Sequence, residues 1–137
     1  MRDGQVADSD RVAARLPDLH RRTREFALGM IKLYSVVPKT TVAQVIGKQL
    51  LRSGTSVGAH CREAHRARSN AEFVSKVELA LQELEETAYW LELLADIRVV
   101  PAGQIDALAK EANELTAIMV TAARRVKRRA TGATART

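Results

Sequence analysis

Residues 105–126 read IDALAKEANELTAIMVTAARRV, and apolar side chains recur along them in alternating steps of three and four residues. The recurring positions are Ile105, Leu108, Ala112, Leu115, Met119, Ala122 and Val126. Because an α-helix completes a turn about every 3.6 residues, this spacing places them on one narrow stripe. Such a stripe leaves water by packing against other helices. The pattern therefore predicts a long helix of a helical bundle, which follows a turn at 98–103 and runs to about Arg129.

Two helices are predicted nearer the N-terminus. The first spans about 19–37 and has Asp18 as a plausible cap. It ends before Pro38, because proline cannot continue a helix. The second spans about 42–64 and is capped by Thr40 or Thr41, whose hydroxyls can accept a hydrogen bond from the first turn.

A third helix is predicted over about 70–97, where Ser69-Asn70-Ala71-Glu72 forms a capping box. Its apolar residues cover more than one stripe, so a single core cannot bury them all. Exposed apolar patches rarely persist on soluble monomers, and most oligomers consist of identical subunits. We therefore expect a homo-oligomer, with Tyr89, Trp90 and Leu93 at the interface.

The predicted fold is all-α, an up-down-up-down antiparallel four-helix bundle, because short connections favour antiparallel neighbours. Glycine and proline are scarce and strict alternation of β-branched residues is absent, which argues against a sheet. A chain of 137 residues fits one domain. We expect a flexible N-terminal segment over 1–17, the bundle over 18–129 and a disordered basic tail over 130–137.

The cellular location is predicted from cysteine usage and from the N-terminus. Cys61 is the only cysteine, so no intramolecular disulfide can form. Residues 1–10 are polar and lack the apolar region that export requires, and no apolar run approaches the ~20 residues of a membrane span. These features favour a reducing compartment, and we expect a cytoplasmic protein.

The net charge of +6 is unevenly distributed. Residues 70–97 hold seven acids and one lysine, whereas residues 120–137 hold six bases and no acid. A basic cluster of this kind attracts phosphate backbones or acidic protein surfaces, without indicating sequence specificity.

Several short segments carry a resemblance to a known family. Residues 47–59 read GKQLLRSGTSVGA, 62–64 read REA, 68–73 read RSNAEF, 24–27 read REFA and 86–94 read ETAYWLELL. Over roughly 20–128 the chain resembles the four-helix-bundle family first described as proteins encoded in intervening sequences of bacterial 23S ribosomal RNA genes. That family's plan is a pair of small-residue and Arg-containing turns that end the second helix, followed by an Arg-x-Ser-x-x-Glu-Phe entry into the third. His60-Cys61 departs from the plan, because members usually carry Asn and an aromatic residue there.

The resemblance implies a compact up-down bundle that often assembles as a ring-like homopentamer. The accessory protein of diversity-generating retroelements is similar as well. It uses a basic pentameric surface to bind nucleic acid and its reverse transcriptase, so the resemblance implies the same kind of partners for this chain.

Residues 54–58 spell G-x-S-x-G, the nucleophile elbow of serine hydrolases, which requires a strand before the serine, a strained turn and a helix behind it. The predicted helix over 42–64 supplies neither the strand nor the turn. Each glycine costs a helix interior about 1 kcal/mol relative to alanine, so a packing reason is needed to explain them. We interpret both glycines as positions of close helix approach.

His60, Cys61 and His65 suggest a metal site, since Cys61 and His65 are four residues apart and can share a helix face. Glu63 falls on another face, however, and further ligands are missing. Cys61 continues the apolar stripe, so we favour a buried inert thiol between two solvated histidines. The Glu-x-x-His motif of di-iron bundles is absent from the sequence. We expect neither a metal nor a cofactor.

The acids of the third helix are a second candidate for chemistry. They are Glu78, Glu83, Glu85, Glu86 and Glu92. They lie mostly off the apolar stripe, where charged residues are usually solvated, so a catalytic pair is not favoured. In an assembly they could instead meet the basic residues of a neighbouring subunit.

Basic residues give the main functional hypothesis. The candidate nucleic-acid-binding residues are Arg62, Arg66, Arg68, Arg124, Arg125, Lys127, Arg128 and Arg129, and Arg21, Arg22 and Arg24 could extend them into a belt repeated around an oligomer. Bases at a helix C-terminus can also serve only to offset the helix dipole, and both interpretations stay open. Aromatic residues are not interleaved with these bases, so binding would involve the backbone and depend strongly on salt.

The sequence shows no catalytic triad, metal cage or phosphate loop. We therefore expect a non-enzymatic oligomeric bundle that binds RNA or DNA, as an accessory of a larger nucleoprotein. The alternative is a protein-interaction scaffold with an acidic protein partner. Neither a membrane nor a small-molecule substrate is expected.

Overall fold

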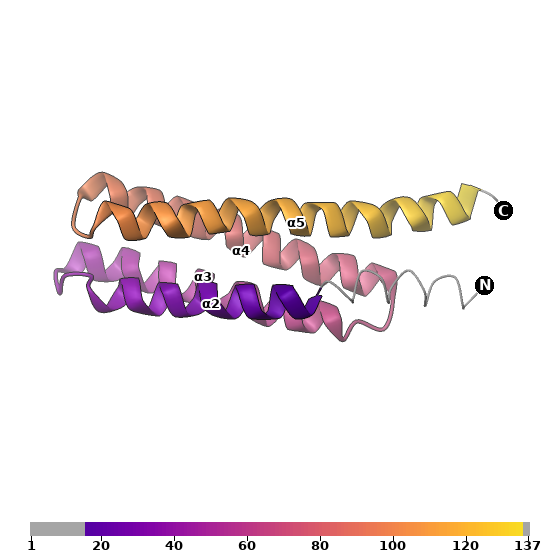
Figure 1. Ribbon diagram of the computed structural model, residues 1–137, viewed down its shortest axis with the longest axis horizontal. Helices are drawn as coiled ribbons and strands as arrows, with labels where there is room; N and C mark the ends of the chain where they lie inside the picture. The colour runs from indigo at the N-terminus through magenta and orange to yellow at the C-terminus, as the bar shows by residue number, and fades with distance from the viewer. Residues whose placement is uncertain (1–15, 136–137) are drawn as a thin grey trace.

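The computed structural model describes residues 16–135, and this part of the chain is all-α, without a strand. Its helices are α2 (Leu16–Ser35), α3 (Thr41–His65), α4 (Asn70–Ile97) and α5 (Ala102–Ala135). They run alternately in opposite directions (Figure 1), and each packs mainly against its neighbour in sequence, with a smaller contact between α2 and α5. The predicted four-helix bundle is confirmed.

The helix starts follow the predicted capping chemistry for α3 and α4. The Thr40 hydroxyl accepts a hydrogen bond from the Ala43 amide at 3.4 Å, and the Ser69 hydroxyl accepts one from the Glu72 amide at 3.1 Å. Each bond satisfies an amide that has no partner inside the helix. Thr40, of the two threonines considered, is therefore the cap of α3.

Two predicted helix ends were wrong. Helix α2 begins at Leu16, so Asp18 lies in its first turn, where a carboxylate is favourable near the positive end of the helix dipole. Helix α5 continues past Arg129 to Ala135, which takes in the first residues of the expected tail. Its alanines and threonines can extend a helix that packing has already nucleated. The predicted flexible segment 1–17 lies mostly outside the described residues.

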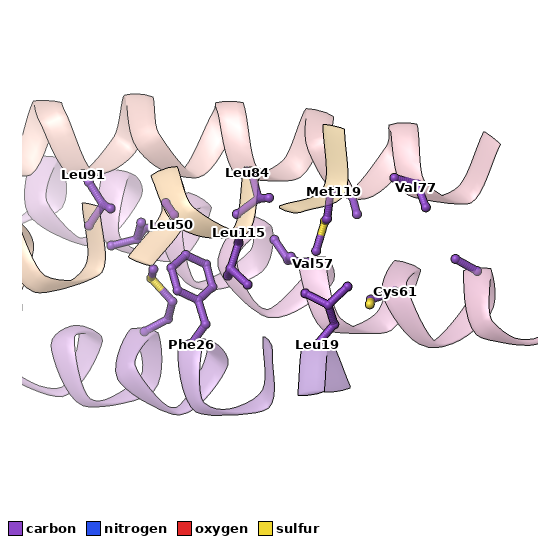
Figure 2. Packing of buried hydrophobic residues seen from close by; sticks show 14 of the residues in the cluster. Leu19, Phe26, Leu50, Val57, Cys61, Val77, Leu84, Leu91, Leu115 and Met119 are labelled. Atoms are coloured by element: carbon purple, nitrogen blue, oxygen red, sulfur yellow. The ribbon is translucent and has the colours of Figure 1, made fainter. Parts of the chain in front are cut away.

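The core lies along the axis between the four helices (Figure 2). Its largest fully buried side chains are Phe26, Met30, Leu33, Leu50, Val57, Leu84, Leu91, Leu94, Leu115 and Met119. On α5, Ala123 is buried in place of Ala122, and Leu108 lies at the edge of the core. A strict repeat of 3.5 residues drifts around a straight helix by ~20° per heptad. This drift explains why the buried position moves from Ala122 to Ala123 near the end of α5.

The glycines of α3 bring its backbone close to α2. A Cβ at Gly54 would lie 2.5 Å from Cγ of Met30, and one at Gly58 would lie 3.2 Å from Oγ1 of Thr23. The close approach that we inferred from the sequence therefore exists, and it accounts for two glycines in a helix interior.

Candidate nucleic-acid interface

The topology brings the predicted basic residues to one end of the bundle. Helices α3 and α5 both run toward that end, on the right in Figure 1, where α2 and α4 begin. Residues 62–68 and 124–129, far apart in the sequence, thus lie at the same end. Helices α3 and α5 are not packing neighbours, because each packs against α2 and α4. The two groups therefore flank the first turns of α4.

Ion pairs separate these basic residues into two classes. Lys127 lies 2.8 Å from a carboxylate oxygen of Glu78, so its charge is already partnered. The exposed arginines at this end form no salt bridge with any described residue, and we call them the basic end: Arg62, Arg66, Arg68, Arg124, Arg125 and Arg128. Arg129, which has a further interaction within the protein, is not included.

Nearer the middle of the bundle, bases and acids neutralise one another within the protomer. Arg22 of α2 donates to Glu111 from Nε at 3.0 Å and from Nη2 at 2.8 Å, and to Glu114 at 3.2 Å. The two glutamates stabilise the charged guanidinium and raise the pKa of Arg22. Arg22 and its two glutamates border a shallow groove between α2 and α5, whose described lining holds no histidine or cysteine.

The acids of α4 pair with bases of the same chain. Arg52 lies 3.4 Å from Glu83 and 2.6 Å from Glu86, and the hydrogen bond from Arg52 lowers the pKa of Glu86. With the pair formed by Glu78, three of the five acids considered already have partners on α3 or α5. These three acids therefore do not need a neighbouring subunit to be neutralised.

The three residues considered for a metal point in different directions. Cys61 is buried in the same core cluster as Leu19 (Figure 2), and burial raises its pKa to about 11. Nδ1 of His60 lies 2.9 Å from Glu63, and Nε2 lies 3.7 Å from Glu83. The prediction that His60 is freely solvated was therefore wrong. No set of three His, Cys, Asp or Glu side chains among residues 18–130 could hold a metal ion.

The G-x-S-x-G segment lies within α3. The Ser56 hydroxyl donates a hydrogen bond to the Arg52 carbonyl of the same helix at 2.7 Å. A hydroxyl held in this way on a straight helix lacks the sharp turn of a nucleophile elbow.

A pair of histidines at the junction of α2 and α3 was not found from the sequence. The rings of His20 and His65 meet edge to face, with centroids 5.1 Å apart and planes at 85°. Nε2 of His20 is enclosed and has no hydrogen-bond partner among the described residues. Burial lowers the pKa of His20, and the charges of His65, Arg62 and Arg66 lower it further. The two histidines are far apart in the sequence, and only the packing of α2 on α3 brings them together.

None of the described helices combines the length and the apolar character needed to cross a membrane.

Known proteins with similar sequences and structures agree with this architecture. Residues 18–121 match the family described as 23S rRNA-intervening sequence protein. A crystal structure of a protein with unknown function from the S23 ribosomal protein family of Bacteroides thetaiotaomicron is similar with a TM-score of 0.75. The two chains are 34% identical, and the similarity covers 80% of this chain and 98% of that one. No curated protein matches this chain. The chain belongs to the 23S rRNA-intervening sequence protein family.

Proposed function

We propose that this protein binds the phosphate backbone of RNA or DNA through its basic end, as a non-enzymatic accessory of a nucleoprotein complex. The observation that supports this most is that the exposed arginines there have no acidic partner among the described residues. The bases nearer the middle of the bundle contrast with them, since Arg22 and Arg52 are each held by two glutamates.

An unpaired arginine binds phosphate at a lower cost than a paired one. A paired guanidinium must give up its carboxylate before it can contact phosphate, whereas an exposed unpaired one loses only water and counterions. Arginine also presents several N–H donors in a planar fork that fits two phosphate oxygens. The basic end therefore favours a phosphate ligand on both counts.

The expected binding is weakly specific. Of the described Phe, Tyr and Trp rings, Phe73 in the first turn of α4 lies at the basic end, but it is buried in the core and offers no stacking surface. Phe26 is also in the core, and Tyr89 and Trp90 are in the second half of α4, which leads away from this end. Without stacking, affinity comes from charge and decreases steeply as salt increases.

Assembly would multiply these contacts. Tyr89 is 54% exposed, while Trp90 and Leu93 are half-buried, so each retains surface that a second subunit could cover. We propose that they contribute to a homo-oligomer, a pentamer by resemblance to the family. Several basic ends on one particle would then bind a single polyanion with an avidity beyond that of one subunit.

Fluorescence anisotropy with labelled single-stranded RNA, at low and at high salt, tests the proposal. The informative variants replace three arginines by glutamine, at 62, 66 and 68 or at 124, 125 and 128. The matched control replaces Lys39, Lys48 and Lys110 by glutamine, which removes the same amount of charge. These three lysines are exposed and lie nearer the opposite end. Each arginine variant should reduce the slope of log affinity against log salt by up to about 2, since each phosphate contact on a single strand contributes about 0.7.

Two results would oppose the proposal. No binding at low salt would overturn it and favour the alternative, a protein-interaction scaffold for an acidic partner. An equal loss in the lysine control would show that net charge, and not the basic end, determines the affinity.

A further inference from the structure

The junction of α2 and α3 combines two histidines with two arginines that form no salt bridge to a described residue. Arg62 lies in the last turn of α3 and Arg66 is the C-cap of that helix, with His65 as the last helical residue between them. His20 packs against His65 from α2, and Nε2 of His20 is enclosed without a partner in the described part of the chain. A buried polar atom without a partner is uncommon and calls for an explanation.

All the charges that act on His20 from α3 are positive or can become so. They belong to His65, Arg62 and Arg66, and each disfavours protonation of His20. Helix α5, which also packs against α2, presents Glu111 and Glu114, but Arg22 binds both. Among the described residues, the junction therefore concentrates positive charge without a compensating carboxylate. This arrangement repels a metal cation and attracts an anion.

We propose that His20, His65, Arg62 and Arg66 form a phosphate subsite whose affinity increases as the pH falls. The inference rests on the proposed function, because it assigns one part of the basic end to phosphate and makes that part sensitive to pH. A bound phosphate supplies the negative charge that the junction lacks. It can accept hydrogen bonds from the arginine forks and from a protonated imidazole.

The pH dependence follows from linkage between proton and anion. In the free protein the surrounding positive charges hold the pKa of His20 below its ordinary value of 6.5. A phosphate offsets those charges, so the pKa of His20 is higher in the complex than in the free protein. Protonation and phosphate binding then favour each other. The affinity for phosphate therefore increases as the pH falls below the pKa that His20 has in the complex. It becomes constant once the pH is below the pKa that His20 has in the free protein.

Nuclear magnetic resonance of the histidine ring protons tests the subsite in the wild-type chain. The rings are titrated from about pH 5 to about pH 8, with and without inorganic tripolyphosphate. We expect tripolyphosphate to raise the pKa of His20 by about half a unit or more, which corresponds to at least about a threefold change in affinity, and to shift the ring signals of His65. His60, which faces Glu63 and Glu83, is the internal control and should not shift.

A second measurement compares RNA binding at about pH 5.5 and about pH 8. The wild-type chain and the His60→Asn control should bind more tightly at the lower pH. The double variant His20→Asn, His65→Asn should bind equally at both, and circular dichroism verifies that it folds.

The outcomes separate this inference from the proposed function. Equal shifts of all three histidines, or no shift, would overturn the subsite, even if RNA binds. A selective shift of His20 and His65 with tripolyphosphate, but no RNA binding at low salt, would support the subsite and oppose nucleic-acid binding. RNA binding that is independent of pH in the wild-type chain would count against the subsite alone.

Discussion

At the scale of single residues, α2 packs closely against α3 because Gly54 and Gly58 of α3 have no side chain. Gly54 leaves the space that Met30 occupies, and Gly58 faces Thr23. The helix gives up intrinsic stability at each glycine and gains a closer contact with its neighbour. Thr87 and Ser53 are buried as well, and their hydroxyls share a hydrogen bond of 2.9 Å between α4 and α3, so they are not left unsatisfied.

Gly54→Ala should destabilise the protein by about 1 to 3 kcal/mol, because the new methyl group overpacks a buried contact by more than the helix gains in propensity. Gly103→Ala is the matched control, since no heavy atom lies within 4 Å of the added Cβ, and it should be neutral or stabilising. Urea unfolding followed by circular dichroism measures both. Equal effects at the two positions would contradict the packing explanation.

At the scale of elements, each helix is defined by its stripe and its ends. The turn between α4 and α5 contains the only non-glycine residue with positive φ among those described, Arg98, at φ 54° and ψ 44°. This is the left-handed conformation that commonly ends a helix, and it is usually occupied by glycine because a Cβ is unfavourable there.

Arg98→Gly should therefore stabilise the fold by about 0.5 to 1 kcal/mol, since it relieves the Cβ in a left-handed conformation that the turn requires. Arg98→Ala is the control, because it removes the same side chain but keeps the Cβ, and it should have little effect. Thermal unfolding of the three proteins gives the comparison. A gain with alanine equal to that with glycine would assign the effect to the side chain instead.

At the scale of the whole molecule, charge and apolar surface are distributed toward different ends. The basic end lies where α3 and α5 finish, whereas exposed apolar residues follow the connection of α2 to α3 and the last turns of α4. They are Val36, Val42, Val45, Tyr89 and Ile97, and the second half of α2 adds the exposed Leu28 and Ile31. An assembly that covers the apolar surface could thus leave the arginines exposed.

Light scattering at micromolar concentration should report a multiple of the chain mass. Tyr89→Arg should lower that multiple, because an unpaired charge would have to be buried at the proposed interface. Ala117→Arg places the same charge at an exposed position of α5 and should leave the assembly intact. A monomeric wild-type chain would remove the interface proposal, together with the gain in avidity that depends on it.

Most of the architecture could be predicted from the sequence. The helix positions, the caps at Thr40 and Ser69 and the burial of Cys61 were predictable because each depends on residues within about one or two helical turns. Helix ends were less predictable. The first turn of α2 and the last turns of α5 depend on how far packing extends a helix, and local composition does not determine this.

Only the tertiary structure determined which side chains meet across helices. The pairs Lys127 with Glu78, Arg52 with Glu86 and His20 with His65 each join residues on different helices. Their contact depends on the rotation of each helix about its axis and on its shift along its neighbour, which many side chains set together. The sequence by itself determined the helices, their apolar faces and the excess of positive charge. The fold alone determined which arginines lack a salt bridge within the described part of the chain, because neutralisation depends on distance in space and not on spacing along the chain.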